Sequence, residues 1–204
     1  MEKDKLILRI GRDGREMELT ISPVSACDYA VKLSPVNRVN ALADGSNVII
    51  FAGMVRFAER DEELSLVVGH EIAHNALDHR TKKVGNYALG TVLDIIIVAT
   101  TGVDTGGVFG NLGGIAFSKS FEAEADYMGL YITARAGFDI TDAADFWRRM
   151  AMEFPANIEK HFTSSHPSTA ERFTAIEKAV EEIEGKREQG KPLKASLNEV
   201  QYGA

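Results

Sequence analysis

The sequence is poor in cysteine and in basic charge, and both shortages limit what it can do. Its 204 residues include a single cysteine, Cys27. One cysteine excludes an internal disulfide and a cysteine-rich zinc site, so any metal must be held by histidine and carboxylate. The formal net charge is -7. A nucleic-acid-binding surface needs a basic stripe, so we expect no nucleic-acid partner.

Long apolar runs are also scarce. The first twenty residues are charged throughout, which argues against a signal peptide. The most apolar stretch, Val92–Thr100, is interrupted by Asp94 and falls short of the ~20 residues that a membrane span requires. With 45% hydrophobic and 26% charged residues, the chain has the composition of a soluble globular protein. We therefore expect one soluble domain with no membrane-spanning helix.

The segment from Ala88 to Phe117 leaves two interpretations open. It is apolar, and its second half is rich in glycine. A short core helix followed by a mobile loop explains this pattern. A surface that gates a cleft or makes a peripheral membrane contact explains it as well.

Strand patterns occupy the first quarter of the chain, and helical patterns follow. Apolar alternation around Asp13-Gly14 predicts a hairpin, and a turn at Asp44-Gly45 predicts that residues 39–43 pair with 47–53. Helices are expected from Asp61 to about Lys82, from about 118 to Gly137, from about 142 to 154, and for some twenty residues from Ser168. The predicted fold is α+β and mainly helical, with a small antiparallel sheet.

We divide the chain into three parts on this basis. Residues 1–35 form an N-terminal hairpin and connection, residues 36–190 form the main domain, and residues 191–204 form a C-terminal tail.

The strongest chemical signal is the pattern His70-Glu71-Ile72-Ala73-His74. At 3.6 residues per turn, His70 and His74 lie one above the other on the same helical face, where both imidazoles can reach one ion. Glu71 is rotated by about 100° and lies beside the pair, where it can take a proton from a metal-bound water. The pattern predicts half of a zinc site with its general base.

A catalytic zinc needs a third protein ligand. His79 lies half a turn round the same predicted helix from His70, so we interpret it as a surface or second-face residue. Glu122 and Asp126 are four apart and share a helical face, while Glu124 points elsewhere. Solvated acidic faces are common, but beside an active-site helix that lacks a third ligand histidine this carboxylate pair becomes the leading candidate.

Several longer segments carry a family resemblance. VNALADGSNVIIFAGMVRF, DEELSLVVGHEIAHN, SFEAEADYMGLYITARAGFD, FWRRM and SSHPSTAERF occur in this order between Val36 and Lys178. The order resembles that of the HtpX/BepA/CAAX-prenyl-protease-type zinc metallopeptidases, which are gluzincins of metallopeptidase family 48. The resemblance implies a zincin-like fold, with the sheet beside the active-site helix.

The resemblance also implies roles for particular residues. One zinc ion per chain would be held by His70, His74 and Glu122, with Glu71 as the general base. Asp126 would orient a ligand histidine.

Further from the ion, the resemblance assigns the strand Asn40, Ala41, Leu42 and Ala43 to the cleft, where it would pair with an extended polypeptide substrate. His166 would stabilise the developing oxyanion, or occupy the open coordination position in a closed form. Arg172 would support that region. A histidine that precedes a helix cap, and an arginine in a structural salt bridge, are the plainer interpretations of these two residues.

The expected function is zinc-dependent endopeptidase activity on polypeptides, in protein quality control of the bacterial cell envelope or periplasm. The chain lacks the membrane helices of the integral-membrane branch of the family. Its opening, LILRIGRDGREMELTISPV, is similar to the closing hairpin of a PDZ-like domain, which would make the chain part of a longer protein whose N-terminus could attach it to a membrane. A hairpin that belongs to the protease domain itself is the other interpretation of this segment. The alternative hypothesis is a zinc-binding chaperone, or a latent protease with little hydrolytic activity. The substrate and the oligomeric state are not indicated.

Overall fold

A computed structural model describes residues 5–12, 14–21, 28–111, 118–154, 166 and 170–197. Its strands are β1 (Leu6–Arg12), β2 (Arg15–Ile21), β3 (Ala30–Ser34), β4 (Ala41–Ala43) and β5 (Asn47–Phe51). Its helices are α1 (Ala52–Phe57), α2 (Asp61–Ala76), α3 (His79–Thr101), α5 (Ser118–Arg135), α6 (Ala143–Glu153) and α7 (Ala170–Glu188). The predicted α+β, mainly helical class is confirmed. Ser168, the expected start of the last helix, lies outside the described residues.

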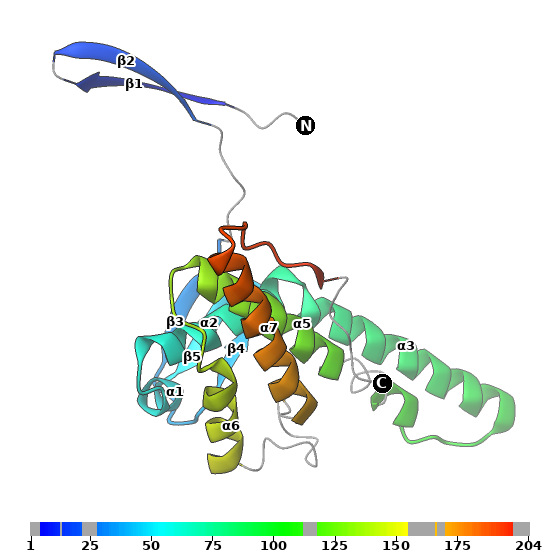
Figure 1. The fold of residues 1–204 in the computed structure, drawn as a ribbon. Helices are drawn as coiled ribbons and strands as arrows, with labels where there is room; N and C mark the ends of the chain where they lie inside the picture. Colours follow the sequence, from blue (N-terminus) through cyan, green and yellow to red (C-terminus); the bar gives the residue numbers. More distant parts are fainter. Residues whose placement is uncertain are drawn as a thin grey trace.

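The N-terminal hairpin forms as predicted. Strands β1 and β2 are antiparallel, with Arg12 opposite Arg15 across a turn in which Gly14 has a φ of 73°. The hairpin projects away from the helices (Figure 1). Every residue of β2 is exposed. The likeness to a PDZ-like domain stays a prediction.

A second, three-stranded sheet has the order β3-β5-β4. Strands β4 and β5 are antiparallel as predicted, and their turn is closed by the Asp44 carboxylate, which accepts hydrogen bonds from the backbone N–H of Ser46 and Asn47. Strand β3 is an addition, because residues expected to be a connection run parallel to β5. The sheet is therefore mixed rather than purely antiparallel, and β4 lies at its edge.

Helices α2 and α5 pack against each other through two glycines. A Cβ added at Gly69 would lie 2.4 Å from Thr133 Oγ1, and one added at Gly129 would lie 2.9 Å from the His70 backbone. Only residues without a side chain allow this close approach. The contact brings the histidine face of α2 against the acidic face of α5.

The helix expected to run to about Lys82 in fact ends at Ala76. Asp78 then adopts the left-handed conformation, with φ 53° and ψ 38°, which is uncommon for a residue other than glycine. The chain changes direction there, and α3 begins at His79. This break decides where His79 lies.

Helix α3 overturns two expectations for the apolar segment: that it forms a short core helix, and that it is too short to span a membrane. It is one continuous helix of 23 residues, not a short core helix, and in Figure 1 it extends from the body of the molecule. Its most apolar 18-residue window has a mean hydropathy of 1.5, so by length and composition alone it is sufficient to cross a membrane. Buried core helices also pass that test, but only 11% of this window is buried. Residues 112–117 of the segment lie outside the described residues.

Candidate metal centre

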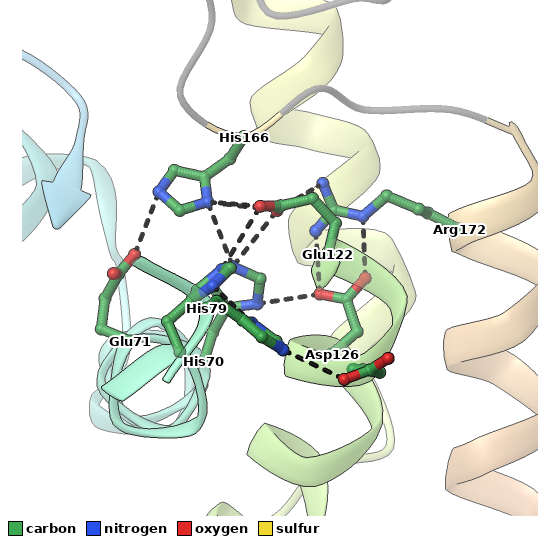
Figure 2. Close-up of polar contacts among 9 residues, drawn as sticks. His70, Glu71, His79, Glu122, Asp126, His166 and Arg172 are labelled. Atoms are coloured by element: carbon green, nitrogen blue, oxygen red, sulfur yellow. Dashed lines mark hydrogen bonds and ion pairs between the residues drawn. The ribbon is translucent and has the colours of Figure 1, made fainter. Parts of the chain in front are cut away.

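Four side chains from three parts of the chain converge on one point, and Figure 2 labels three of them, His70, Glu122 and His166. His70 and His74 come from α2, Glu122 from α5, and His166 from the chain that precedes α7. One donor atom from each lies within 4.8 Å of the others. Three of these residues are the ligand set implied by the family resemblance, and the fourth is the histidine expected to face the metal.

The spacing of the donor atoms fits a tetrahedral ion. His70 Nε2 lies 3.0 Å from His74 Nε2, 3.4 Å from Glu122 Oε2 and 3.3 Å from His166 Nδ1. His74 Nε2 lies 3.3 Å from Glu122 Oε1. Ligands held at ~2.0–2.1 Å from a tetrahedral zinc ion are separated by about 3.3 Å. The set of two or three imidazoles and one carboxylate is also the donor chemistry of zinc.

The burial and the charges of these residues also favour a bound cation. Glu122 is 3% exposed and His70 is 2% exposed. Burial by itself would raise the pKa of Glu122, but His166 and Arg172 outweigh it and hold that pKa well below its usual range. Burial would lower the pKa of His70, yet its contacts with Asp126 and Glu122 raise the pKa to about 10. The carboxylates thus favour a positive charge among the imidazoles, which a metal ion supplies.

Asp126 and Arg172 form the wall behind His70. Asp126 Oδ1 lies 3.0 Å from Nδ1 of His70, on the side of the ring away from the other donors. Arg172 donates from Nε and from its terminal nitrogen to the two oxygens of Asp126, both at 2.8 Å. The same guanidinium lies 3.2 Å from Glu122 Oε2. The sequence placed both residues near the site, and the structure brings them into contact with it.

Glu71 lies next to the four donors without being one of them. It is 2% exposed, and its Oε1 is 3.3 Å from His166 Nε2. Within the part of the chain that the structure describes, its buried Oε2 has no hydrogen-bond partner. An unsatisfied buried acceptor costs free energy, so a donor such as water would bind to it favourably.

The expectation that His79 is a surface residue is wrong. His79 is 3% exposed, and its Nδ1 lies 2.9 Å from Nδ1 of His74. Its Nε2 is 3.1 Å from Glu124 Oε2, and its ring stacks on Phe121. Burial lowers the pKa of His79 to about 4, so the ring is neutral near pH 7. The expectation assumed one continuous helix, and the left-handed Asp78 removes that premise.

The cleft beside the donors is lined partly by the predicted substrate strand. Leu42 and Ala43 border a cavity of about 200 Å³ together with Glu71, His74 and Phe121. Asn40 and Ala41 line a smaller hollow that Glu71 also borders. The strand therefore runs past Glu71, and its role in binding substrate stays a prediction.

Trp147 is a site residue that was not predicted from the sequence. It lines the smaller hollow, and its ring centroid lies 5.4 Å from that of His70. The guanidinium of Arg172 lies over the same ring, 5.8 Å from its centroid. The segment FWRRM was part of the family resemblance, so its tryptophan could have been predicted as a site residue.

Comparisons with known proteins agree with this geometry. Residues 18–180 match the sequence model of Peptidase family M48. The chain is 31% identical to "Mitochondrial metalloendopeptidase OMA1" of Schizosaccharomyces pombe, over 78% of this chain and 50% of that protein. It is 26% identical to "Metalloendopeptidase OMA1, mitochondrial" of Bos taurus, over 81% of this chain and 35% of the relative. It is 28% identical to "Beta-barrel assembly-enhancing protease" of Yersinia pestis, over 56% of this chain and 26% of that protein. The chain thus spans half or less of the length of these relatives.

Proposed function

The chain belongs to peptidase family M48, and from this membership and the geometry of its metal centre we propose that it is a zinc-dependent metalloendopeptidase. The observation that carries the proposal is the convergence of His70, His74 and Glu122, with the Glu71 carboxylate beside them, whose Oε2 has no hydrogen-bond partner among the described residues. A protein that only stored zinc would have no use for that carboxylate.

His70, His74 and Glu122 would hold one zinc ion. When bound there, zinc would lower the pKa of a coordinated water toward ~7 and polarise a peptide carbonyl. Glu71 would accept the proton of the attacking water and deliver a proton to the leaving amine. Asp126 keeps His70 in the orientation that turns its Nε2 toward the other donors.

We assign substrate positioning to β4. It is an edge strand, and it lines both hollows around Glu71. An extended polypeptide can add to such an edge through backbone hydrogen bonds, which hold the scissile bond in place without demanding a particular sequence. This supports a polypeptide substrate bound in extended form.

The test is casein hydrolysis by the zinc-loaded wild type and Glu71→Gln. Loss of the general base should lower the rate by about 100- to 10,000-fold while zinc stays bound. The matched control is Glu181→Gln, which removes an exposed carboxylate on α7. Full activity in Glu71→Gln would rule out the proposed role of that residue.

A specific contact also favours a latent form of this protease. His166 Nδ1 lies among the donor atoms, 3.1 Å from Glu122 Oε2, while its Nε2 faces Glu71. In that place His166 would fill the fourth coordination position and block the general base. His166→Ala should then increase the hydrolysis rate. A decrease would instead assign His166 to the oxyanion.

For the cellular setting we propose the bacterial envelope, with protein quality control as the role. The relatives named for β-barrel assembly support this setting, while those named as mitochondrial point to an organelle. We further propose that α3 contacts a lipid bilayer. Its exposed apolar side chains continue from a basic start at Arg80, Lys82 and Lys83, all three of which are exposed and suited to anionic headgroups.

A further inference from the structure

Two histidines of the metal centre differ in what lies behind them. His70 has a carboxylate, Asp126, directly at its Nδ1. Behind His74 stands a second imidazole, that of His79, and only then a carboxylate, that of Glu124. Accounts of metal sites that stop at the ligands miss such partners, which fix the tautomer and the direction of the ligand ring.

We propose that His79, held by Glu124, is the positioning residue that prepares His74 to bind the metal. The inference rests on the proposed function, because it concerns the same ion. It adds a residue that neither the histidine pattern nor the carboxylate pair implied.

With neutral imidazoles and an ionised Glu124, the hydrogen-bond chain has one consistent assignment of protons. Glu124 Oε2 is an acceptor, so His79 Nε2 must donate to it across 3.1 Å. A neutral imidazole carries one N–H, so Nδ1 of His79 is then an acceptor. It faces Nδ1 of His74 at 2.9 Å, and that nitrogen must donate. The remaining nitrogen of His74, Nε2, is left with a free lone pair.

That lone pair points where it is needed. His74 Nε2 lies 3.0 Å from His70 Nε2 and 3.3 Å from Glu122 Oε1, among the other donors. The wrong tautomer would place an N–H there and would have to rearrange before binding an ion. His79 thus selects the metal-binding tautomer in advance.

The fold holds His79 firmly in this role. Its ring stacks on Phe121 with a centroid distance of 4.6 Å and an interplanar angle of 18°. Phe121 and Glu124 both lie on α5, the helix that also supplies Glu122. The left-handed Asp78 turns the start of α3 toward α5 and so brings His79 into this position.

The test is the zinc dissociation constant of metal-stripped protein, measured by competition with a chelator. His79→Leu keeps the bulk of the ring but removes both hydrogen bonds, and should weaken zinc binding about 10- to 100-fold. His79→Asn keeps an acceptor close to the position of Nδ1 and should recover most of that loss. Thr81→Ala, two residues along on the exposed face of α3, is the matched control and should bind as the wild type does.

Two results would overturn the proposal. One is zinc binding by His79→Leu within about twofold of the wild type. The other is equal loss in the Leu and Asn variants, which would mean that packing on Phe121 matters and the hydrogen bond does not. If wild type itself bound no zinc, the proposed function would fail instead.

A second measurement needs no variant and no metal. Long-range ¹H–¹⁵N NMR of the metal-free wild type reports which nitrogen of each histidine carries the proton. The expected result is a proton on Nδ1 of His74 and on Nε2 of His79. The opposite tautomer of His74 would contradict the inference, even if His79→Leu failed to fold.

Discussion

The body around α2 and α5 and the projecting helix α3 arrange polar and apolar groups in opposite ways. In the body, apolar side chains such as Val67 and Tyr131 are buried, and so are the charges of the metal centre. Along α3 the apolar side chains are exposed, and a carboxylate, that of Asp94, is buried. The body is therefore stabilised by its own buried core, whereas the surface of α3 suits an apolar environment.

Both regions obey the same rule for their buried carboxylates. Asp126 is paired with Arg172, and Asp94 accepts hydrogen bonds from Thr105 Oγ1 and from the backbone N–H groups of Phe109 and Gly110. Buried charges persist only with such partners. On α3, the charge of Asp94 interrupts the apolar stretch in sequence, but its burial removes it from the surface of the helix.

The largest expected effect on stability comes from the body. Arg172→Met leaves the carboxylates of Asp126 and Glu122 buried without their cation, which should cost about 3–5 kcal/mol in the free energy of unfolding. Arg148→Met removes a more exposed arginine that pairs with Glu177 on the surface, and should cost less than about 1 kcal/mol. Urea denaturation of the metal-stripped proteins measures both. Equal costs would remove the distinction between the buried and surface pairs.

The second prediction concerns the surface of α3. Combined Leu89→Ser, Val92→Ser and Ile96→Ser substitutions remove exposed apolar side chains from one face of the helix. Binding to vesicles that contain phosphatidylglycerol should fall by more than about 100-fold in a flotation assay. The free energy of unfolding should change by less than about 0.5 kcal/mol, because the body does not depend on these side chains.

The control for this experiment is Met152→Ser, which removes an exposed apolar side chain from α6 in the body. It should float with vesicles as the wild type does. Flotation of the triple variant, or failure of the wild type to float, would exclude the lipid contact.

The smallest effect is local to the segment after α3. Asp94→Ala should speed amide hydrogen exchange at Phe109 and Gly110, while the global free energy of unfolding changes by less than about 1 kcal/mol. Asp104→Ala, which removes a carboxylate that accepts from Gly106 N–H in the same segment, should leave exchange at those two amides unchanged.

The hydrogen bonds that the Asp94 carboxylate accepts should be lost at low pH. Burial would raise the pKa of Asp94, but the Thr105 hydroxyl and the two backbone N–H groups lower it below its ordinary value of 3.8. The stabilisation is therefore present above pH 3.8 and is lost as the pH falls through the lower, folded-state pKa. Protection of Gly110 that disappeared already at neutral pH would contradict this assignment.

Much of the metal centre was predictable because it depends on local spacing. The i, i+4 spacing puts His70 and His74 on one face of a helix in any context, and the same spacing pairs Glu122 with Asp126. That these two faces meet depends on Gly69 and Gly129, whose roles appear only when the helices are packed. The lack of a suitably placed third histidine made the carboxylate pair the leading candidate beforehand, and the family resemblance then named Glu122 as the ligand.

The features that escaped prediction each depend on a single conformation or a distant partner. One left-handed residue, Asp78, moves His79 from an expected surface to the back of His74. Strand β3 is only five residues long, and it is defined by its partner β5. The length of α3 was underestimated because Asp94 was counted as an interruption, although residues 105–110 satisfy it.

The most direct test of the metal centre is zinc content after dialysis of the wild type beside Glu122→Ala. Of the three proposed zinc ligands, Glu122 is the one that α5 supplies, so its loss tests whether the two helices together form one site. The account predicts one zinc ion per wild-type chain and, in a folded Glu122→Ala, less than about a tenth of that. A wild type without zinc, or a variant that keeps a full equivalent, would contradict it.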